Sequence, residues 1–120
     1  MIHLERLSDI LVITPRGALE KFDIETIAKE VDSVIASKGR VTGLMINIES
    51  FPGWRDFAAF SAHVKFVARN HRAIERIAVV TSSRFLKFVP RIAGIFVHPV
   101  IRPFGVKERE QAFAWLDTGR

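Results

Sequence analysis

The stretch VTGLMINIE, Val41 to Glu49, decides the fold because it is short and almost continuously apolar. A run of this kind is typical of a central strand that other elements cover on both faces. The run IERIAVVT, Ile74 to Thr81, has the same character and predicts a second buried strand. Helical patterns surround both runs, so the sequence predicts an α/β fold.

The segment before these strands predicts a β-hairpin. IHLERL, residues 2–7, alternates apolar and polar side chains, and Ser8-Asp9 forms a tight turn into ILVITPRG, residues 10–17. A further short strand, VIRPFG, is expected at residues 100–105. The chain therefore begins with a hairpin and continues as βαβαβα units.

Four segments have helical periodicity: residues 22–39, 54–71, 82–96 and 107–119. In the first, Asp23 is the expected N-cap and Gly39 the expected residue just past the end. The second follows the turn FPGW and carries one apolar stripe, made by Phe57, Phe60, Val64 and either Val67 or Ala68. The last is expected to turn three residues inward: Ala112, Trp115 and Leu116.

The length of 120 residues fits a single domain, residues 1–120. The chain has no cysteine, no Gly-rich phosphate cradle, no Gly-x-Ser-x-Gly elbow and no pair of histidines at i, i+4. We therefore expect no enzymatic activity, no cofactor and no metal. The N-terminal sequence does not resemble a signal peptide, and no apolar run approaches the roughly 20 residues of a membrane span, so a cytoplasmic location is expected.

The stretch SSRFLKFVPRIAGIF, Ser82 to Phe96, predicts a helix with an apolar and a basic side. Phe85 lies in the apolar stripe, whereas Phe88 falls at the boundary with the cations. The basic side carries Arg84, Lys87 and Arg91. Pro90 removes a backbone donor inside the helix, so the segment is expected to be loosely held. A basic amphipathic helix of this kind suits peripheral contact with an anionic membrane, although a plain solvated face explains the charges equally well.

Four motifs in this order resemble the SpoIIAA-like family: FPGW after the third strand, RIAVV in the fourth, IRPF in the fifth and AFAWL at the end. The resemblance covers nearly the whole chain. Members share the fold of STAS domains and anti-sigma-factor antagonists, which is related to CRAL-TRIO lipid-binding domains. It implies a mixed sheet of about five strands flanked by four helices.

The resemblance also directs attention to Ser50. Relatives that act as anti-sigma-factor antagonists carry a phosphorylatable serine at the start of the second helix, in an Asp-Ser-Ser-Gly-like motif. This chain has NIESFPGW there, and Ser50 is the serine of that loop, placed before the turn and not at the helix. Ser50 is therefore the candidate regulatory phosphosite, with a local turn role as the alternative.

Two functions remain open. The first is a binding module that associates with membranes and holds a small apolar, lipid-like ligand, with Trp54, Phe57, Phe60, Phe85 and Phe88 as candidate contacts; the same aromatics could equally be core. The second is a regulatory protein–protein interaction module of the anti-sigma-factor-antagonist type. No motif for specific nucleic-acid binding is present. A symmetric homodimer is the expected assembly.

Overall fold

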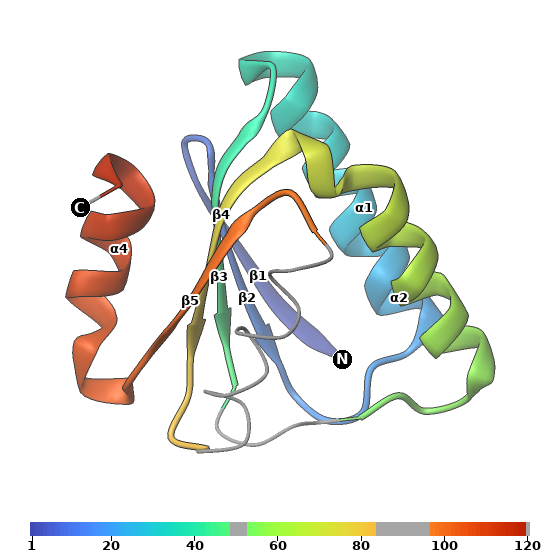
Figure 1. Ribbon diagram of the computed structural model, residues 1–120. Coiled ribbons are helices and arrows are strands. Elements are labelled where there is room, and N and C mark those ends of the chain that lie inside the picture. The colour runs from blue at the N-terminus through green and yellow to red at the C-terminus, as the bar shows by residue number, and fades with distance from the viewer. Residues whose placement is uncertain (49–52, 84–96, 120) are drawn as a thin grey trace.

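The sheet has five strands in the order in which they occur in the sequence (Figure 1). The computed structural model describes residues 1–48, 53–83 and 97–119. The strands are β1 (Ile2–Leu7), β2 (Ile10–Pro15), β3 (Val41–Asn47), β4 (Ile74–Val80) and β5 (Val100–Phe104). β1 pairs antiparallel with β2, and the remaining neighbours pair in parallel. The predicted mixed sheet, with its N-terminal hairpin, is confirmed.

Helices cover both faces of this sheet (Figure 1). α1 (Lys21–Lys38) and α2 (Phe57–Asn70) lie on one side, and α4 (Arg109–Thr118) lies on the other. The short 3₁₀ turns η1 (His71–Ala73) and η2 (Val106–Glu108) precede β4 and α4. The described ranges thus contain three α-helices where four were expected. The remaining one was predicted for residues 82–96, of which 84–96 lie outside the described residues.

The ends of α1 show one correct and one wrong prediction. Gly39 is the C-cap in the left-handed conformation, with φ +86°, and its N–H donates to the Ile35 carbonyl at 2.7 Å. Asp23, however, is not the N-cap. The helix begins one turn earlier, with Glu20 as N-cap, and the Asp23 carboxylate accepts a hydrogen bond from the Glu20 N–H at 2.9 Å. The acidic residue therefore closes the capping motif from inside the first turn.

The alternation of side chains along the strands divides the core into two layers. The layer under α4 is made of Ile10, Val12, Met45, Ala78, Val80, Phe104, Ala112, Trp115 and Leu116. The layer under α1 is made of Leu11, Ile13, Ile27, Val31, Val34, Val41, Leu44 and Ile74. The three residues of the last helix that were expected to face inward, among them Trp115, are all buried.

Gly43 allows α4 to approach the middle of the sheet closely. A Cβ atom placed on Gly43 would lie 2.8 Å from the Leu116 Cβ, which is closer than side chains approach in proteins. The end of the helix is held as well, since the Arg76 guanidinium donates to the Leu116 carbonyl at 3.0 Å. The position of α4 is thus fixed by β3 from below and by β4 at its C-terminal end.

Candidate functional site

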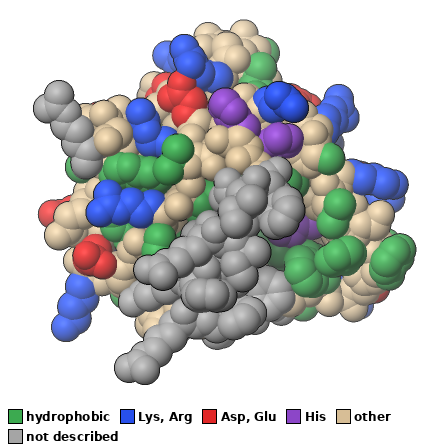
Figure 2. All heavy atoms as spheres, in the orientation of Figure 1, with side chains coloured by type: hydrophobic (Ala, Val, Ile, Leu, Met, Phe, Trp, Pro, Cys, Tyr) green, Lys and Arg blue, Asp and Glu red, His purple; other side chains and the backbone are tan. Residues whose placement is uncertain are grey.

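Helix α2 turns its large apolar side chains toward solvent. Phe57 is 80% exposed, Val64 is 51% exposed and Phe60 is 40% exposed. Hydrophobic side chains accordingly gather at the surface over the N-terminal half of α2 (Figure 2). The interpretation of Phe57 and Phe60 as core residues is therefore wrong. Isolated exposed apolar residues are ordinary, but neighbouring ones on one helix face indicate a surface that contacts something.

The orientation of α2 follows from the size of the residues on its other face. Ala59 and Asn70 are the buried residues of the helix, and Ala62 and Phe66 are half-buried between them. The small side chains of Ala59 and Ala62 let α2 pack closely beside α1. The Asn70 side chain is satisfied locally, because its amide donates to the Phe66 carbonyl at 3.0 Å. The large stripe is left on the outside.

Trp54 joins the exposed phenylalanines into one aromatic cluster. The Trp54 and Phe60 rings meet edge to face, with ring centroids 4.8 Å apart and an interplanar angle of 86°. Phe57 stacks on Phe60 at 6.2 Å. Edge-to-face and offset contacts of this kind stabilise aromatic pairs. We call Trp54, Phe57, Phe60 and Val64 the α2 aromatic surface.

The indole of Trp54 also fixes the state of His63. Its Nε1–H donates to the His63 Nδ1 at 3.0 Å, so the neutral imidazole carries its proton on Nε2. Burial lowers the pKa of His63 below its ordinary value, because desolvation disfavours the charged ring. His63 is therefore a neutral acceptor that holds Trp54 in place at physiological pH.

The backbone around the cluster is also anchored. Leu19 forms a bridge with Trp54: its N–H donates to the Gly53 carbonyl and its own carbonyl accepts from the Arg55 N–H, both at 2.8 Å. Asp56 caps α2, with its carboxylate accepting from the Ala59 N–H at 2.9 Å. The α2 aromatic surface is thus presented by a fixed framework, which lowers the entropy lost on binding.

A cleft of about 490 Å³ lies beside this surface. Its lining is mainly apolar and consists of Trp54, His63, Val64, Val67, Ala68, His71 and Val97. His63 and His71 both face the cleft, but among the residues that the structure describes no His, Cys, Asp and Glu side chains gather in a group able to hold a metal ion. The size of the cleft suits a small ligand.

The outer side of α2 is basic beyond the aromatic cluster. Lys65, Arg69 and Arg72 are exposed, and α2 itself contains no acidic residue. A partner that covers the α2 aromatic surface therefore meets positive charge at its edge. None of the helices in the described ranges is both long and apolar enough to span a bilayer.

Of the predicted ligand contacts, the structure brings together Trp54, Phe57 and Phe60. The other predicted site residues lie outside the described residues: Ser50, Arg84, Phe85, Lys87, Phe88 and Arg91. The regulatory phosphosite and the basic membrane helix therefore stay predictions.

The sequence did not predict a second cavity, which lies on the α4 side of the sheet and measures about 740 Å³. Thr14 and Asn47 line it at the carboxyl ends of β2 and β3. The signal available in the sequence was weak: one polar residue follows the buried run of each strand, Thr14 before the final Pro15 of β2 and Asn47 at the end of β3. Other polar residues of the lining come from distant segments, and only the fold brings them together.

Residues 10–117 match the family model described as SpoIIAA-like, which covers most of the chain. The chain belongs to the SpoIIAA-like family. This confirms the resemblance seen in the motifs. No curated protein matches the chain.

Solved structures place this SpoIIAA-like chain among proteins of the same fold. It is similar to an uncharacterized DUF3478-family protein with a SpoIIAA-like fold from Shewanella loihica PV-4, at 22% identity and a TM-score of 0.76, with 97% of this chain and 92% of that chain covered. It is similar to the anti-sigma factor antagonist SpoIIAA in its unphosphorylated form, at 20% identity and a TM-score of 0.63, covering 95% and 98%. The phosphorylated Bacillus cell fate determinant SpoIIAA gives 18% identity and a TM-score of 0.56, covering 92% and 97%.

Proposed function

We propose that this SpoIIAA-like protein is a non-enzymatic binding module that docks on a regulatory protein through the α2 aromatic surface. The observation that carries the proposal is the exposure of Phe57, at 80%, beside Phe60 and Val64 on one helix face. Aromatic residues dominate the energetics of protein interfaces when a partner encloses them. Here they are held in position before any partner arrives.

The energy available from this surface is adequate for specific docking. Complete burial of one phenylalanine side chain contributes about 1.5–3 kcal/mol. Phe57 has most of its surface to bury, and Phe60 and Val64 each have about half. Together they supply the central apolar part of an interface, to which the surrounding polar contacts add.

The charges around the surface describe the partner. Lys65, Arg69 and Arg72 favour a partner whose apolar groove has an acidic rim. Opposite charges on the two proteins speed their association, and salt slows it by screening those charges. Binding should therefore weaken as ionic strength rises.

The similarity to SpoIIAA supports a regulatory protein as the partner, in preference to a protein of another class. SpoIIAA, which shares this fold, is described as an anti-sigma factor antagonist, and structures of its phosphorylated and unphosphorylated forms are known. If Ser50 is phosphorylated in this chain, the phosphate adds about 1.5–2 negative charges shortly before Trp54 in the sequence. Those charges would oppose an acidic partner and weaken docking.

The chain offers a matched pair for testing the surface. Phe57 on α2 and Phe22 on α1 are both highly exposed, at 80% and 74%. Affinity capture from cells would compare wild type, Phe57→Ser and Phe22→Ser, with quantification by mass spectrometry. We expect a partner that wild type and Phe22→Ser retain and that Phe57→Ser loses by tenfold or more. The absence of such a partner, or equal retention by all three proteins, would exclude docking through this surface.

A second candidate is binding of a small apolar ligand, which the cleft beside Trp54 favours. Ala68 lines this cleft, and Ala68→Leu would fill part of it. Organic extraction and mass spectrometry of purified protein should then detect a ligand with wild type and Phe57→Ser but not with Ala68→Leu. Co-sedimentation with phosphatidylglycerol vesicles, compared with phosphatidylcholine vesicles, separates this from membrane association. Binding to the anionic vesicles alone would support a peripheral membrane role.

A further inference from the structure

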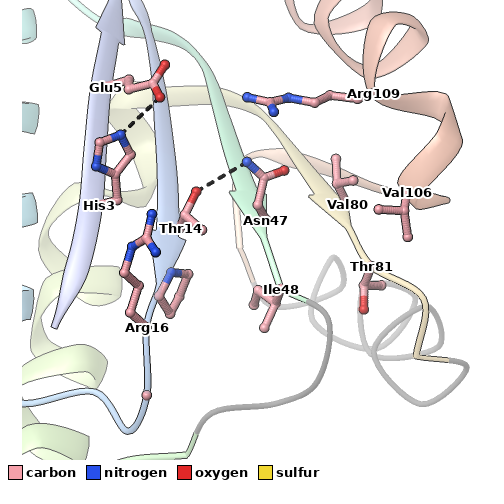
Figure 3. Close-up of a pocket in the computed structure, with 12 residues that line it drawn as sticks. His3, Glu5, Thr14, Arg16, Asn47, Ile48, Val80, Thr81, Val106 and Arg109 are labelled. Atoms are coloured by element: carbon pink, nitrogen blue, oxygen red, sulfur yellow. Dashed lines mark hydrogen bonds and ion pairs between the residues drawn. The ribbon is translucent and has the colours of Figure 1, made fainter.

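The second cavity forms a polar groove on the face of the sheet opposite α2 (Figure 3). We define this polar groove by the polar side chains that line it: His3, Glu5, Thr14, Arg16, Asn47 and Arg109. They come from β1, β2, the residue after β2, β3 and the start of α4. The groove lies at the carboxyl ends of the parallel strands, which is where open α/β sheets commonly bind ligands.

Its floor offers hydrogen-bond donors. The Asn47 amide donates to the Thr14 hydroxyl oxygen at 3.3 Å (Figure 3). That bond uses one of the two N–H groups of the amide, and the Thr14 hydroxyl keeps its own proton for donation. Two neutral donors therefore stand side by side on β2 and β3, within the cavity.

Two guanidinium groups approach these donors from different sides. Arg109 extends from α4 toward Asn47, and Arg16 points from the end of β2 toward Thr14 (Figure 3). The Arg109 guanidinium lies 5.5 Å from the centre of the Phe113 ring, a cation–π contact that restricts its movement. Planar guanidinium groups are suited to carboxylates, which they bind through paired hydrogen bonds.

Among the lining residues that the structure describes, Glu5 is the one carboxylate, and it limits the charge of the ligand. The Glu5 carboxylate is paired with the His3 ring, with His3 Nε2 and Glu5 Oε1 3.0 Å apart. Two arginines against one carboxylate leave the described part of the lining with one net positive charge while His3 is neutral. A monoanion fits this balance better than a dianion, because a second negative charge would face Glu5.

The lining also has apolar walls, made by Pro15, Ile48, Val80 and Val106, and it is completed by Gly17 and Thr81. An inorganic anion would leave these walls in contact with water, whereas an organic one would cover them. We propose that the polar groove binds a small organic monoanion, in which a carboxylate contacts Arg109, Asn47 and Thr14 and a compact apolar body lies against Val80 and Val106. A volume of about 740 Å³ accommodates such a molecule.

Three probes separate the parts of this proposal: benzoate has the carboxylate and an apolar ring, benzamide has the ring without the charge, and inorganic phosphate has charge without the ring. Binding is followed by the amide signals of ¹⁵N-labelled protein. We expect benzoate to shift the signals of Thr14, Asn47 and Arg109 at concentrations at least tenfold below those needed with benzamide or phosphate. Equal weak responses to benzoate and phosphate would show nonspecific anion attraction and overturn the proposal, as would no response.

Variants locate the binding. Arg109→Gln and Lys107→Gln remove the same charge from neighbouring positions, but Lys107 is exposed and does not line the groove. Benzoate affinity should fall about tenfold in Arg109→Gln and stay within twofold in Lys107→Gln. Asn47→Asp keeps the bond to Thr14, since the hydroxyl can donate to a carboxylate, and should abolish binding through repulsion. Equal losses in Arg109→Gln and Lys107→Gln would contradict the assignment.

Two further measurements keep the test decisive. If Asn47→Asp or Arg109→Gln does not fold, Arg16→Gln replaces it. Arg16 is exposed, so its substitution should not disturb folding, and the change removes the second cation of the groove. Phe57→Ser should leave benzoate affinity unchanged, because the α2 aromatic surface lies on the other face of the sheet. Failure of the polar groove and failure of partner docking are thereby distinguished.

Discussion

Replacing Gly43 by alanine is expected to destabilise the protein by about 1–2 kcal/mol and to move α4 away from the sheet. The added Cβ would lie 2.8 Å from the Leu116 Cβ and 3.0 Å from its Cδ2. Leu116 is completely buried in the core layer under α4, where close packing restricts movement of its side chain. The clash must be relieved by movement of the helix or of the strand.

The magnitude follows from two opposing effects. Gly43 lies inside β3 and its φ is not in the left-handed region, so the backbone itself accepts alanine. An alanine without a clash would stabilise the protein by about 0.4–1 kcal/mol, because it restricts the unfolded chain. Overpacking of a well-filled core costs about 1–3 kcal/mol. The steric cost is the larger effect.

A double-mutant cycle with Leu116→Ala, measured by urea unfolding, isolates the contact. Leu116→Ala alone should cost about 2–5 kcal/mol, through the cavity that it leaves. It removes the Cδ2 atom near Gly43 but keeps the Cβ, so only part of the clash is relieved. The double variant should therefore be more stable than the sum of the single effects predicts, by about 0.5–1 kcal/mol. Strict additivity, or a Gly43→Ala variant as stable as wild type, would refute the reasoning.

The same variant connects the core to the polar groove. Arg109 stands on the first turn of α4, and Leu116 lies two turns later on the same helix. If α4 moves outward, the guanidinium moves away from Asn47. Gly43→Ala should therefore weaken benzoate binding, even though Gly43 does not line the cavity.

Three further outcomes are expected. Asp56→Ala removes the side-chain cap of the Ala59 N–H and should cost about 1 kcal/mol in urea unfolding, whereas Asp56→Asn should retain most of the stability. Because the pKa of His63 is lowered in the folded protein, the unfolded chain binds a proton first as the pH falls. The free energy of unfolding should therefore fall as pH drops below about 6.5 and level off below the folded pKa. This loss should vanish in His63→Gln. Phe57→Ser should change the free energy of unfolding by less than about 0.5 kcal/mol, because this side chain is mostly in water; a larger loss would show that Phe57 is part of the core.

The sheet was predictable because its strands carry the strongest local signal. The runs at β3 and β4 are apolar on both faces, and a buried strand explains that pattern directly. The N-terminal hairpin was predictable from alternation and from the Ser8-Asp9 turn, and Ser8 indeed has φ +61°. The start of α1 was harder to predict, because Glu20 and Asp23 are both acidic residues suited to the N-terminal end of a helix. The backbone conformation shows that Glu20 is the N-cap and that Asp23 lies inside the first turn.

Helix α2 shows where periodicity stops being informative. The period of Phe57, Phe60 and Val64 correctly predicts a helix, but it does not say which side faces the sheet. A second stripe, with Ala59, Phe66 and Asn70, has the same period and is the one that packs inward. Hydrophobicity favoured the wrong stripe, because the inward stripe contains the small Ala59 and the polar Asn70 beside Phe66. The exposed aromatics are consequently better explained by function than by stability.

The polar groove follows from the order and direction of the strands in the sheet, and no local sequence pattern predicts that arrangement. Since β2 to β5 are parallel and lie in sequence order, α1 and α2 cross on one face, and α4 is the helix on the other face within the described ranges. A helix is about 10 Å wide and strands are about 4.8 Å apart, so one helix covers about two strands. α4 covers β3 and β4 and leaves the β1 side of that face open.

The sequence of β1 agrees with this arrangement: Ile2 and Leu4 pack into the core under α1, whereas His3 and Glu5 point to the open face. A polar surface at this place thus follows from the topology and from the alternation of side chains along β1, and the arginines beside it are the basis of the proposed carboxylate site.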